Sequence, residues 1–274
     1  MKTVPGMLRG QTVRGAPCLA MTATATTAEI EELKVNMGFR SLNTVVLSAD
    51  PIQSQFTYMR VERPPNIRGT SGIEEMNGQV KPGLVHLMRR LFLDIYVQKI
   101  REGKPVKKSI WLCKNKSDVA DLYDELCDML PEQAANPLTC PFVMNHSSVG
   151  PITADNIRKR RGDINLYLAT SVMLLGLDLS DIDVVGMIRP FNMCHDLVQA
   201  AGRGGRKLGN GQRRRVVFYL LFNRSDISDN VPGLSKAVKE FCETDDCLKM
   251  YLKRFFGHSN ISDTDSSWCC SNCI

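Results

Sequence analysis

The sequence predicts an α/β fold in which a parallel sheet carries helices on both faces, followed by a short helical module. Apolar, strand-like runs alternate with helical patterns between residues 84 and 221, an order typical of parallel sheets. Five of the ten cysteines lie within the last 33 residues, beyond that alternation. The content of 43% hydrophobic and 23% charged residues is that of an ordinary globular protein, so we do not expect extensive disorder.

Residues 1–63 are expected to form the tail of a first α/β domain. An apolar run leads into a threonine-rich turn within residues 17–26, and Thr26 or Thr27 is suited to cap a helix at 28–37. The same range carries further strand-like runs, at 43–48 and 56–61. Residues 64–83 are rich in proline, glycine and polar residues, which predicts a connecting loop.

Residues 84–230 are expected to form a second, nearly complete α/β domain, and residues 231–274 the helical module. The expected helices cover residues 84–101, 117–130 and 153–161, with one more around Gln199. The expected strands cover residues 109–113, 141–144, 164–169, 183–188 and 215–221. Trp111 lies inside one of these apolar strands, so we place it in the core.

The residues after the strand 164–169 and those at 199–206 are the most informative. Thr170 and Ser171 follow the strand directly, at the edge of a parallel sheet where ligands commonly bind. Arg203 and Arg206 are three residues apart, so we expect them on one face of a helix. Arginine there suits bidentate contact with a phosphate that gains charge during phosphoryl transfer. A surface helix with solvated arginines is the alternative.

The cysteines near the end of the chain are spaced for a metal ion. Cys247 begins a helical pattern, and Cys270 and Cys273 form a C-x-x-C pair. Thiolates at this spacing can share one tetrahedral zinc ion, with Cys269 or Cys242 as a further ligand. The alternative is unpaired cysteines in a reducing compartment, since the scattered pattern does not fit a secreted disulfide framework.

Four segments resemble the RecQ-type ATP-dependent DNA helicases of superfamily 2. The Thr-Ala-Thr-Ala-Thr run within residues 17–26 resembles motif III, 169–178 resembles motif V, 199–206 resembles motif VI, and 247–257 resembles the zinc-binding helix. RNA helicases of the DEAD-box family carry Ser-Ala-Thr at motif III, so the longer repeat favours a DNA helicase. The resemblance covers roughly residues 15–274. It implies RecA-like domains before a zinc-binding module whose last cysteine would fall beyond Ile274.

The resemblance also implies roles for individual residues. Catalytic roles are implied for Arg203, Arg206 and Gln199, and nucleotide contacts for Gly176, Asp178 and Gly202. Contacts with DNA are implied for Thr22, Thr24, His146, Thr170 and Ser171. The implied zinc ligands are Cys247, Cys269, Cys270 and Cys273. A structural role is the alternative for His146, and Trp268 is a candidate for covering the zinc or touching DNA.

Two parts that such a motor needs are missing from the sequence. No segment matches the phosphate loop G-x-x-x-x-G-K-[ST], and no Asp-Glu-x-His box precedes the threonine-rich turn. We therefore expect the C-terminal lobe of a 3′–5′ DNA helicase, which binds ATP with Mg²⁺ only together with a first lobe and is inactive alone. A non-catalytic DNA-binding or regulatory paralogue is the alternative, and an RNA-remodelling fragment is a third interpretation.

Charge and hydropathy indicate the expected partners and location. The formal charge of +6 permits binding to a polyanion, and the resemblance implies single-stranded DNA and duplex junctions, with roles in DNA repair and recombination. The basic runs 158–161 and 213–215 are weak candidates for phosphate contact or nuclear import. No apolar stretch approaches the ~20 residues of a membrane span. We expect a soluble protein, nuclear in a eukaryote and otherwise cytoplasmic, and the sequence leaves its oligomeric state open.

Overall fold

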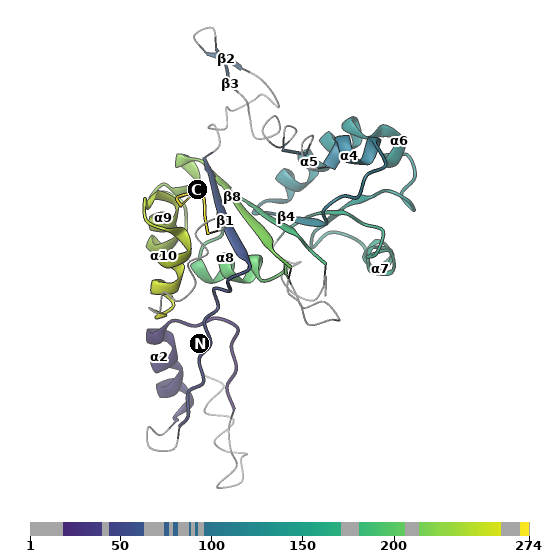
Figure 1. The fold of residues 1–274 in the computed structure, drawn as a ribbon. Helices are drawn as coiled ribbons and strands as arrows, with labels where there is room; N and C mark the ends of the chain where they lie inside the picture. Colours follow the sequence, from purple (N-terminus) through teal and green to yellow (C-terminus); the bar gives the residue numbers. More distant parts are fainter. Residues whose placement is uncertain are drawn as a thin grey trace.

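The computed structural model describes residues 19–39, 44–62, 74–76, 79–81, 88, 91–92, 96–170, 181–205, 214–258 and 269–273. Its centre is a six-stranded sheet with the strand order β1-β8-β7-β4-β6-β5, in which every neighbouring pair is parallel (Figure 1). The strands are β1 (Phe56–Glu62), β4 (Ser109–Cys113), β5 (Phe142–Asn145), β6 (Leu166–Ala169), β7 (Val184–Ile188) and β8 (Val216–Phe222). A separate antiparallel pair joins β2 (Glu74–Met76) and β3 (Gln79–Lys81).

Alternate residues of each strand face the two sides of the sheet, and both sides are covered. In β4, Ile110 and Leu112 pack into one apolar cluster, whereas Trp111 and Cys113 pack into the other. The second cluster is closed by α5 (Lys116–Met129), and the first by α8 (Cys194–Ala201), α9 (Lys236–Glu243) and α10 (Leu248–Phe255). Strands buried on both faces read as continuous apolar runs, and the predicted fold class is confirmed.

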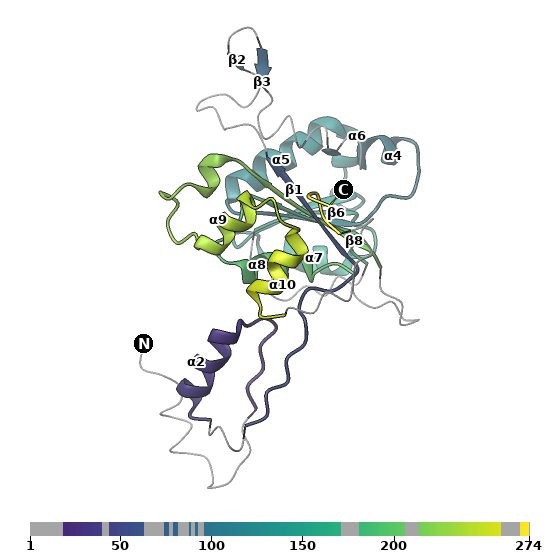
Figure 2. The same cartoon turned by 60° about the vertical axis from the view of Figure 1, so that its left-hand side comes forward.

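The remaining helices are short or lie away from the sheet. They are α2 (Thr27–Met37), α4 (Gln98–Arg101), α6 (Pro131–Ala134), α7 (Pro151–Lys159) and the 3₁₀ turn η4 (Arg224–Ile227). Thr26 caps α2, because its hydroxyl accepts the Glu29 N–H while the Glu29 carboxylate accepts the Thr26 N–H. Figures 1 and 2 show α2 apart from the sheet and next to the end of α10.

Two strands predicted near the amino end are not present in the described residues. Residues 19–22 and 44–48 form no strand, and Leu19, Met21, Val45 and Leu47 are between 82% and 92% exposed. A strand gains its stability from pairing and from an apolar face that is covered. Within the part of the chain that the structure describes, no other strand lies beside these segments.

β1 lies in the range assigned to the first domain, yet it pairs in parallel with β8 from Phe56↔Val216 to Glu62↔Phe222. The six-stranded sheet therefore begins before residues 64–83, where a connecting loop was predicted and the described residues instead form the antiparallel strands β2 and β3. The helical module packs against the same end of the sheet, with α9 and α10 beside β1 (Figure 1). The full division of the chain into domains stays a prediction.

Candidate functional site

Polar residues follow three neighbouring strands at the carboxyl edge of the sheet. Lys114 and Asn115 follow β4, Thr170 follows β6 and His146 follows β5, and these strands are paired in the order β4-β6-β5. Ligands of open parallel sheets bind at this edge. The fold thus brings together His146 and Thr170, two residues that were singled out from the sequence.

Hydrogen bonds join the start of α5 to the loop after β5. The ammonium group of Lys116 donates to the Ser148 hydroxyl at 2.6 Å, and the Ser148 N–H donates to Nδ1 of His146 at 3.2 Å. Thr170 is only 7% exposed, and its N–H donates to the Asn145 carbonyl at 3.2 Å. The side chains of Lys116 and His146 are therefore more accessible to a ligand than the Thr170 hydroxyl.

A cavity of 210 Å³ lies beside this edge, between the ends of β4, β7 and β8, and Arg189 is one of the residues that line it. Arg189 has φ +64°, a left-handed conformation that costs free energy for a residue with a side chain. Its guanidinium donates to Asp118 at 3.1 Å, while its Nε is buried without a hydrogen-bond partner, 4.0 Å from an oxygen of Asp226. A strained, partly satisfied cation in a cavity is typical of a binding site.

Sequence reasoning missed Lys114, Asn115, Lys116 and Arg189. The first three could have been found, because they follow a predicted strand at the same edge as Thr170. Arg189 could not, because its importance comes from its backbone conformation and from the cavity that it lines.

The threonine-rich turn and the helix α8 meet through their side chains. The Gln199 side-chain amide lies 3.5 Å from the Thr24 hydroxyl, and Nε2 of His195 lies 2.9 Å from a carboxylate oxygen of Glu29. The exposed Thr22 donates a hydrogen bond to the Thr24 carbonyl at 2.9 Å. Two segments that lie 175 residues apart in sequence, each with predicted site residues, are thus in contact.

Arg203 does not lie on the helix where it was predicted. α8 ends at Ala201, Gly202 caps it, and Arg203 is half-buried in the turn that follows. The chain turns back to the sheet at Gly205, which has φ +64° and donates to the Ile182 carbonyl at 3.2 Å. Four other predicted site residues lie outside the described part of the chain: Ser171, Gly176, Asp178 and Arg206.

Cys247, Cys269, Cys270 and Cys273 form one cluster. Their sulfur atoms all lie within 4.8 Å of one another, with 3.2 Å between Cys247 and Cys269 and 3.5 Å between Cys270 and Cys273. Sulfurs that share a tetrahedral zinc at about 2.3 Å lie about 3.8 Å apart, so the residues fit this ion. Cys269 completes the set, whereas Cys242 is buried on α9 outside it.

The thiols of the cluster differ in their pKa values. Burial raises the pKa of Cys247, but hydrogen bonds from the Met250 N–H and from the neighbouring thiols outweigh burial and lower it. Burial and these neighbours raise the pKa of Cys273 to about 12 and also raise that of Cys269. Zinc binds thiolates and would displace these protons, so metal binding is expected to depend strongly on pH.

The cysteine-rich segment is attached to the outer edge of β1. The Tyr58 N–H donates to the Cys269 carbonyl at 3.2 Å, and the Ser271 N–H donates to the Tyr58 carbonyl at 2.9 Å. The Arg60 guanidinium reaches the last turn of α9 and donates to the carbonyls of Cys242 and Thr244 at 2.8 and 2.7 Å. The module is therefore held to the sheet by direct hydrogen bonds.

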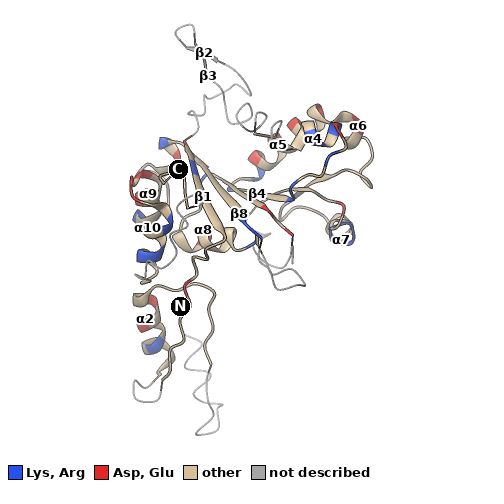
Figure 3. Ribbon diagram, in the orientation of Figure 1, with Lys and Arg blue, Asp and Glu red and all other residues tan. Residues whose placement is uncertain are grey.

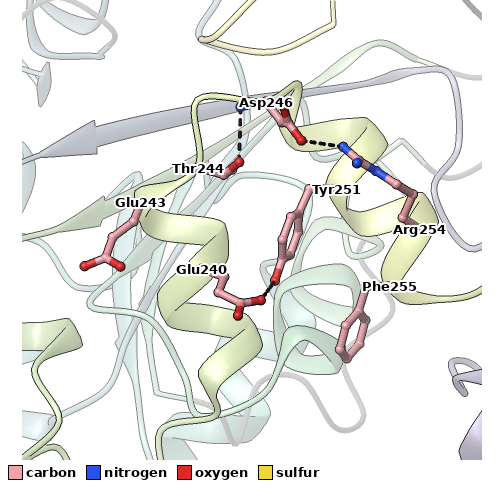
Figure 4. A pocket seen from close by; sticks show the side chains of 7 residues that line it. All are labelled: Glu240, Glu243, Thr244, Asp246, Tyr251, Arg254 and Phe255. Carbon is pink, nitrogen blue, oxygen red and sulfur yellow. Dashed lines mark hydrogen bonds and ion pairs between the residues drawn. The ribbon is translucent and has the colours of Figure 1, made fainter.

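A second cavity, of 590 Å³, lies between α9 and α10 (Figure 4). It carries the carboxylates of Glu240, Glu243 and Asp246 against one guanidinium, that of Arg254, which pairs with Asp246 at 2.7 Å. Figure 3 shows acidic residues on α9 beside basic residues on α10. Because this lining would repel a polyanion, we do not place nucleic acid there.

The basic run 158–161 has mainly structural contacts. Arg158 and Lys159 pair with Asp155 on their own helix, and Arg160 donates to the Cys140 carbonyl at 2.8 Å. Of the run 213–215, Arg214 pairs with Asp183 at 3.1 Å. The predicted phosphate contacts of these runs stay predictions. No helix within the described residues is long and apolar enough to cross a membrane.

Comparisons with known proteins match one family model and several solved structures. The family model of the helicase conserved C-terminal domain matches residues 91–207. S. cerevisiae Dbp5 bound to RNA and ADP BeF3 is 13% identical with a TM-score of 0.47, and the match covers 91% of this chain and 51% of that one. DUF1998 helicase MrfA bound to DNA is 14% identical with a TM-score of 0.45, over 76% and 22% of the two chains.

Helicase Lhr of Mycobacterium smegmatis bound to ssDNA and AMP-PNP is 16% identical with a TM-score of 0.44, over 62% of this chain and 20% of that one. The chain thus spans about half the length of the Dbp5 structure and about a fifth of the other two. No curated protein matches the chain. Residues 91–207 are therefore similar to the helicase conserved C-terminal domain.

Proposed function

We propose that the chain is the C-terminal motor lobe of a RecQ-type, ATP-dependent helicase that moves 3′ to 5′ along DNA. The family match over residues 91–207 supports the motor lobe, and the threonine repeat with the cysteine module supports the RecQ type. The observation that carries the proposal is the row of polar residues at the ends of β4, β6 and β5. A role in DNA repair and recombination, in the nucleus of a eukaryote, follows from the same resemblance.

One DNA strand would lie across the carboxyl edge of the sheet. Lys114, Lys116 and His146 would contact its phosphates, because ammonium groups attract a polyanion and the imidazole of His146 can donate a hydrogen bond to it. Thr170 and Ser171 would add hydrogen bonds at the end of β6, and Thr22 and Thr24 at the threonine-rich turn. Contacts with phosphates position a strand without reading its sequence, so we expect little base specificity.

The nucleotide would bind between this lobe and a lobe that carries the phosphate loop. ATP with Mg²⁺ supplies the phosphoryl group whose transfer drives the motor. Arg203 and Arg206 would meet the γ-phosphate, and Gln199 would couple the nucleotide state to closure of the two lobes. Gly176, Asp178 and Gly202 would shape the turns that approach the nucleotide.

Zinc would hold the helical module together. Cys247 at the start of α10 and Cys269, Cys270 and Cys273 would supply four thiolates, a closed ligand set of the kind found in structural zinc sites. Because Cys269 and Ser271 bond to β1, the ion would fix α10 to the edge strand of the sheet.

Binding of a labelled oligonucleotide tests the proposed DNA surface. Anisotropy titrations with single-stranded DNA, single-stranded RNA and a forked duplex should show binding that weakens with salt and is strongest for DNA. The substitution Lys116→Ala should weaken binding of all DNA sequences alike and lower the salt slope by about one. Lys236→Ala is the matched control, because Lys236 is an exposed lysine of α9 that pairs with Glu240.

An unchanged DNA affinity in Lys116→Ala would show that the carboxyl edge of the sheet is not part of the DNA-binding surface. Binding that prefers RNA would favour an RNA-remodelling lobe instead. Tight DNA binding by a protein with no cellular motor partner would favour a non-catalytic regulatory role.

A further inference from the structure

Three segments distant in sequence meet at His195. Its Nε2 lies 2.9 Å from Glu29 on α2. Its ring packs edge-on against Phe255, the last residue of α10, and against the following Phe256, with ring centroids 5.8 and 5.1 Å apart. The His195 side chain is 14% exposed. His195 is therefore confined by two neighbouring elements in addition to its own helix.

Glu29 serves two partners with one carboxylate oxygen. This Oε2 accepts the Thr26 N–H at 2.7 Å and the Thr26 hydroxyl at 2.8 Å, which caps α2, and it also faces His195. The carboxylate is thus fixed to the end of the threonine-rich turn. Any force that holds His195 against Glu29 also holds that turn against α8.

α10 closes the same junction from the other side. Gly257, just after α10, has φ +79°, and a Cβ atom there would collide with the Thr27 hydroxyl. The end of α10 therefore approaches the first turn of α2 more closely than a residue with a side chain would allow. The end of α10 therefore also supports the contact between α2 and α8.

His195 and Gln199 are four residues apart on α8, so their side chains lie on one face of the helix. We infer that His195 is a positioning residue that holds the threonine-rich turn, through Glu29, at the distance where Thr24 meets Gln199. The inference rests on the proposed role of Gln199. His195 would fix the position of the motif III turn relative to the motif VI helix.

The side-chain amide signal of Gln199 in a ¹⁵N spectrum of the full chain tests this inference, once it has been assigned with a Gln199→Ala variant. Thr24→Ala should shift the signal and speed its exchange with water, because it removes the partner. His195→Ala should produce the same shift, and His195→Gln should reverse it, because glutamine retains a side-chain N–H that can donate to Glu29. Glu31→Ala is the control, since Glu31 lies on α2 and pairs with Lys34.

An unchanged signal in His195→Ala would overturn the inference, and so would an unchanged signal in Thr24→Ala. A signal that shifts in His195→Ala but is not restored by His195→Gln would mean that the imidazole only fills space. DNA affinity does not enter this readout, so failure of the proposed function and failure of the positioning role are told apart.

Discussion

Trp111 shows how tightly the sheet is packed around a single side chain. Its ring is fully buried and stacks on Tyr219, with ring centroids 6.0 Å apart and an interplanar angle of 17°. Gly186 lies between Trp111 and Tyr219 in the register of the sheet, and a Cβ atom there would collide with the indole ring. The sequence predicted the burial of Trp111, but not the need for glycine beside it.

The substitution Gly186→Ala should destabilise the fold by about 1–3 kcal/mol, because the added methyl group overpacks the core. Urea unfolding followed by tryptophan fluorescence would measure the change. Gly162→Ala is the control, since a Cβ atom at Gly162 meets nothing within 4 Å. Equal unfolding midpoints for the two variants would show that the indole ring can move aside at no cost.

Glu29 gives α2 a dependence on pH. Burial alone raises the pKa of Glu29, but hydrogen bonds from Thr26 and the contact with His195 outweigh it and hold the pKa below its ordinary value of 4.5. A lowered carboxyl pKa contributes stability above pH 4.5 that is lost as the pH falls through the folded-state value. The side chain is 44% exposed, so solvent screens the effect.

Amide exchange of residues 27–37, corrected for intrinsic rates, should show protection that falls below about pH 4.5. Glu29→Gln should show no such step, because glutamine at this position retains a capping box and does not titrate. The same step in both proteins would assign the pH dependence to another group.

At the scale of elements, the helices and strands that were predicted well combine a strong hydrophobic pattern with a neighbouring element against which they pack. The strand 109–113 was placed correctly, and the helix at 117–130 is α5 (Lys116–Met129). The described residues of the strand-like segments within 17–26 and at 43–48 form no strand. Apolar sequence predicts burial there, but no strand of the described residues pairs with these segments. The helix bearing Gln199 was expected to carry Arg203 and Arg206, but it ends at Ala201 and Gly202 caps it.

We expect the cysteine module to be stabilised by a zinc ion that is bound by four thiolates. Protein purified without chelator should contain one zinc per chain by mass spectrometry of the metal, and chelation should lower the melting temperature. Cys247→Ser or Cys273→Ser should lose the metal. Cys242→Ala should keep it, because Cys242 lies outside the cluster. Loss of metal in Cys242→Ala alone would contradict this ligand set.

At the scale of the whole molecule, the predicted site residues fall in two places. The polar edge lies at the ends of β4, β6 and β5, whereas Gln199 and Thr24 meet where α2 lies against α8. The sequence predicted that the strands form a parallel sheet, but it did not predict their order. Their pairing, and the cavity at Arg189, depend on contacts between residues far apart in sequence that no local pattern encodes.

The purified chain should release no phosphate from ATP above background, with or without single-stranded DNA. The sequence supplies arginines to the site but contains no phosphate loop and no acidic box to hold Mg²⁺. A coupled phosphate-release assay, with a complete RecQ-type helicase as the positive control, would measure this. ATP turnover stimulated by DNA would overturn the interpretation that the chain supplies only part of the nucleotide site.

The hydrogen bonds between β1 and the cysteine-rich segment have a consequence for association between molecules. β1 is an edge strand, and an edge strand with free N–H and carbonyl groups is a template on which another chain can add a strand. Cys269 and Ser271 take up the outward groups of Tyr58, and the Ser271 hydroxyl accepts the Arg60 N–H at 3.2 Å. The segment that is suited to hold zinc therefore also occupies the edge at which another chain could pair with the sheet.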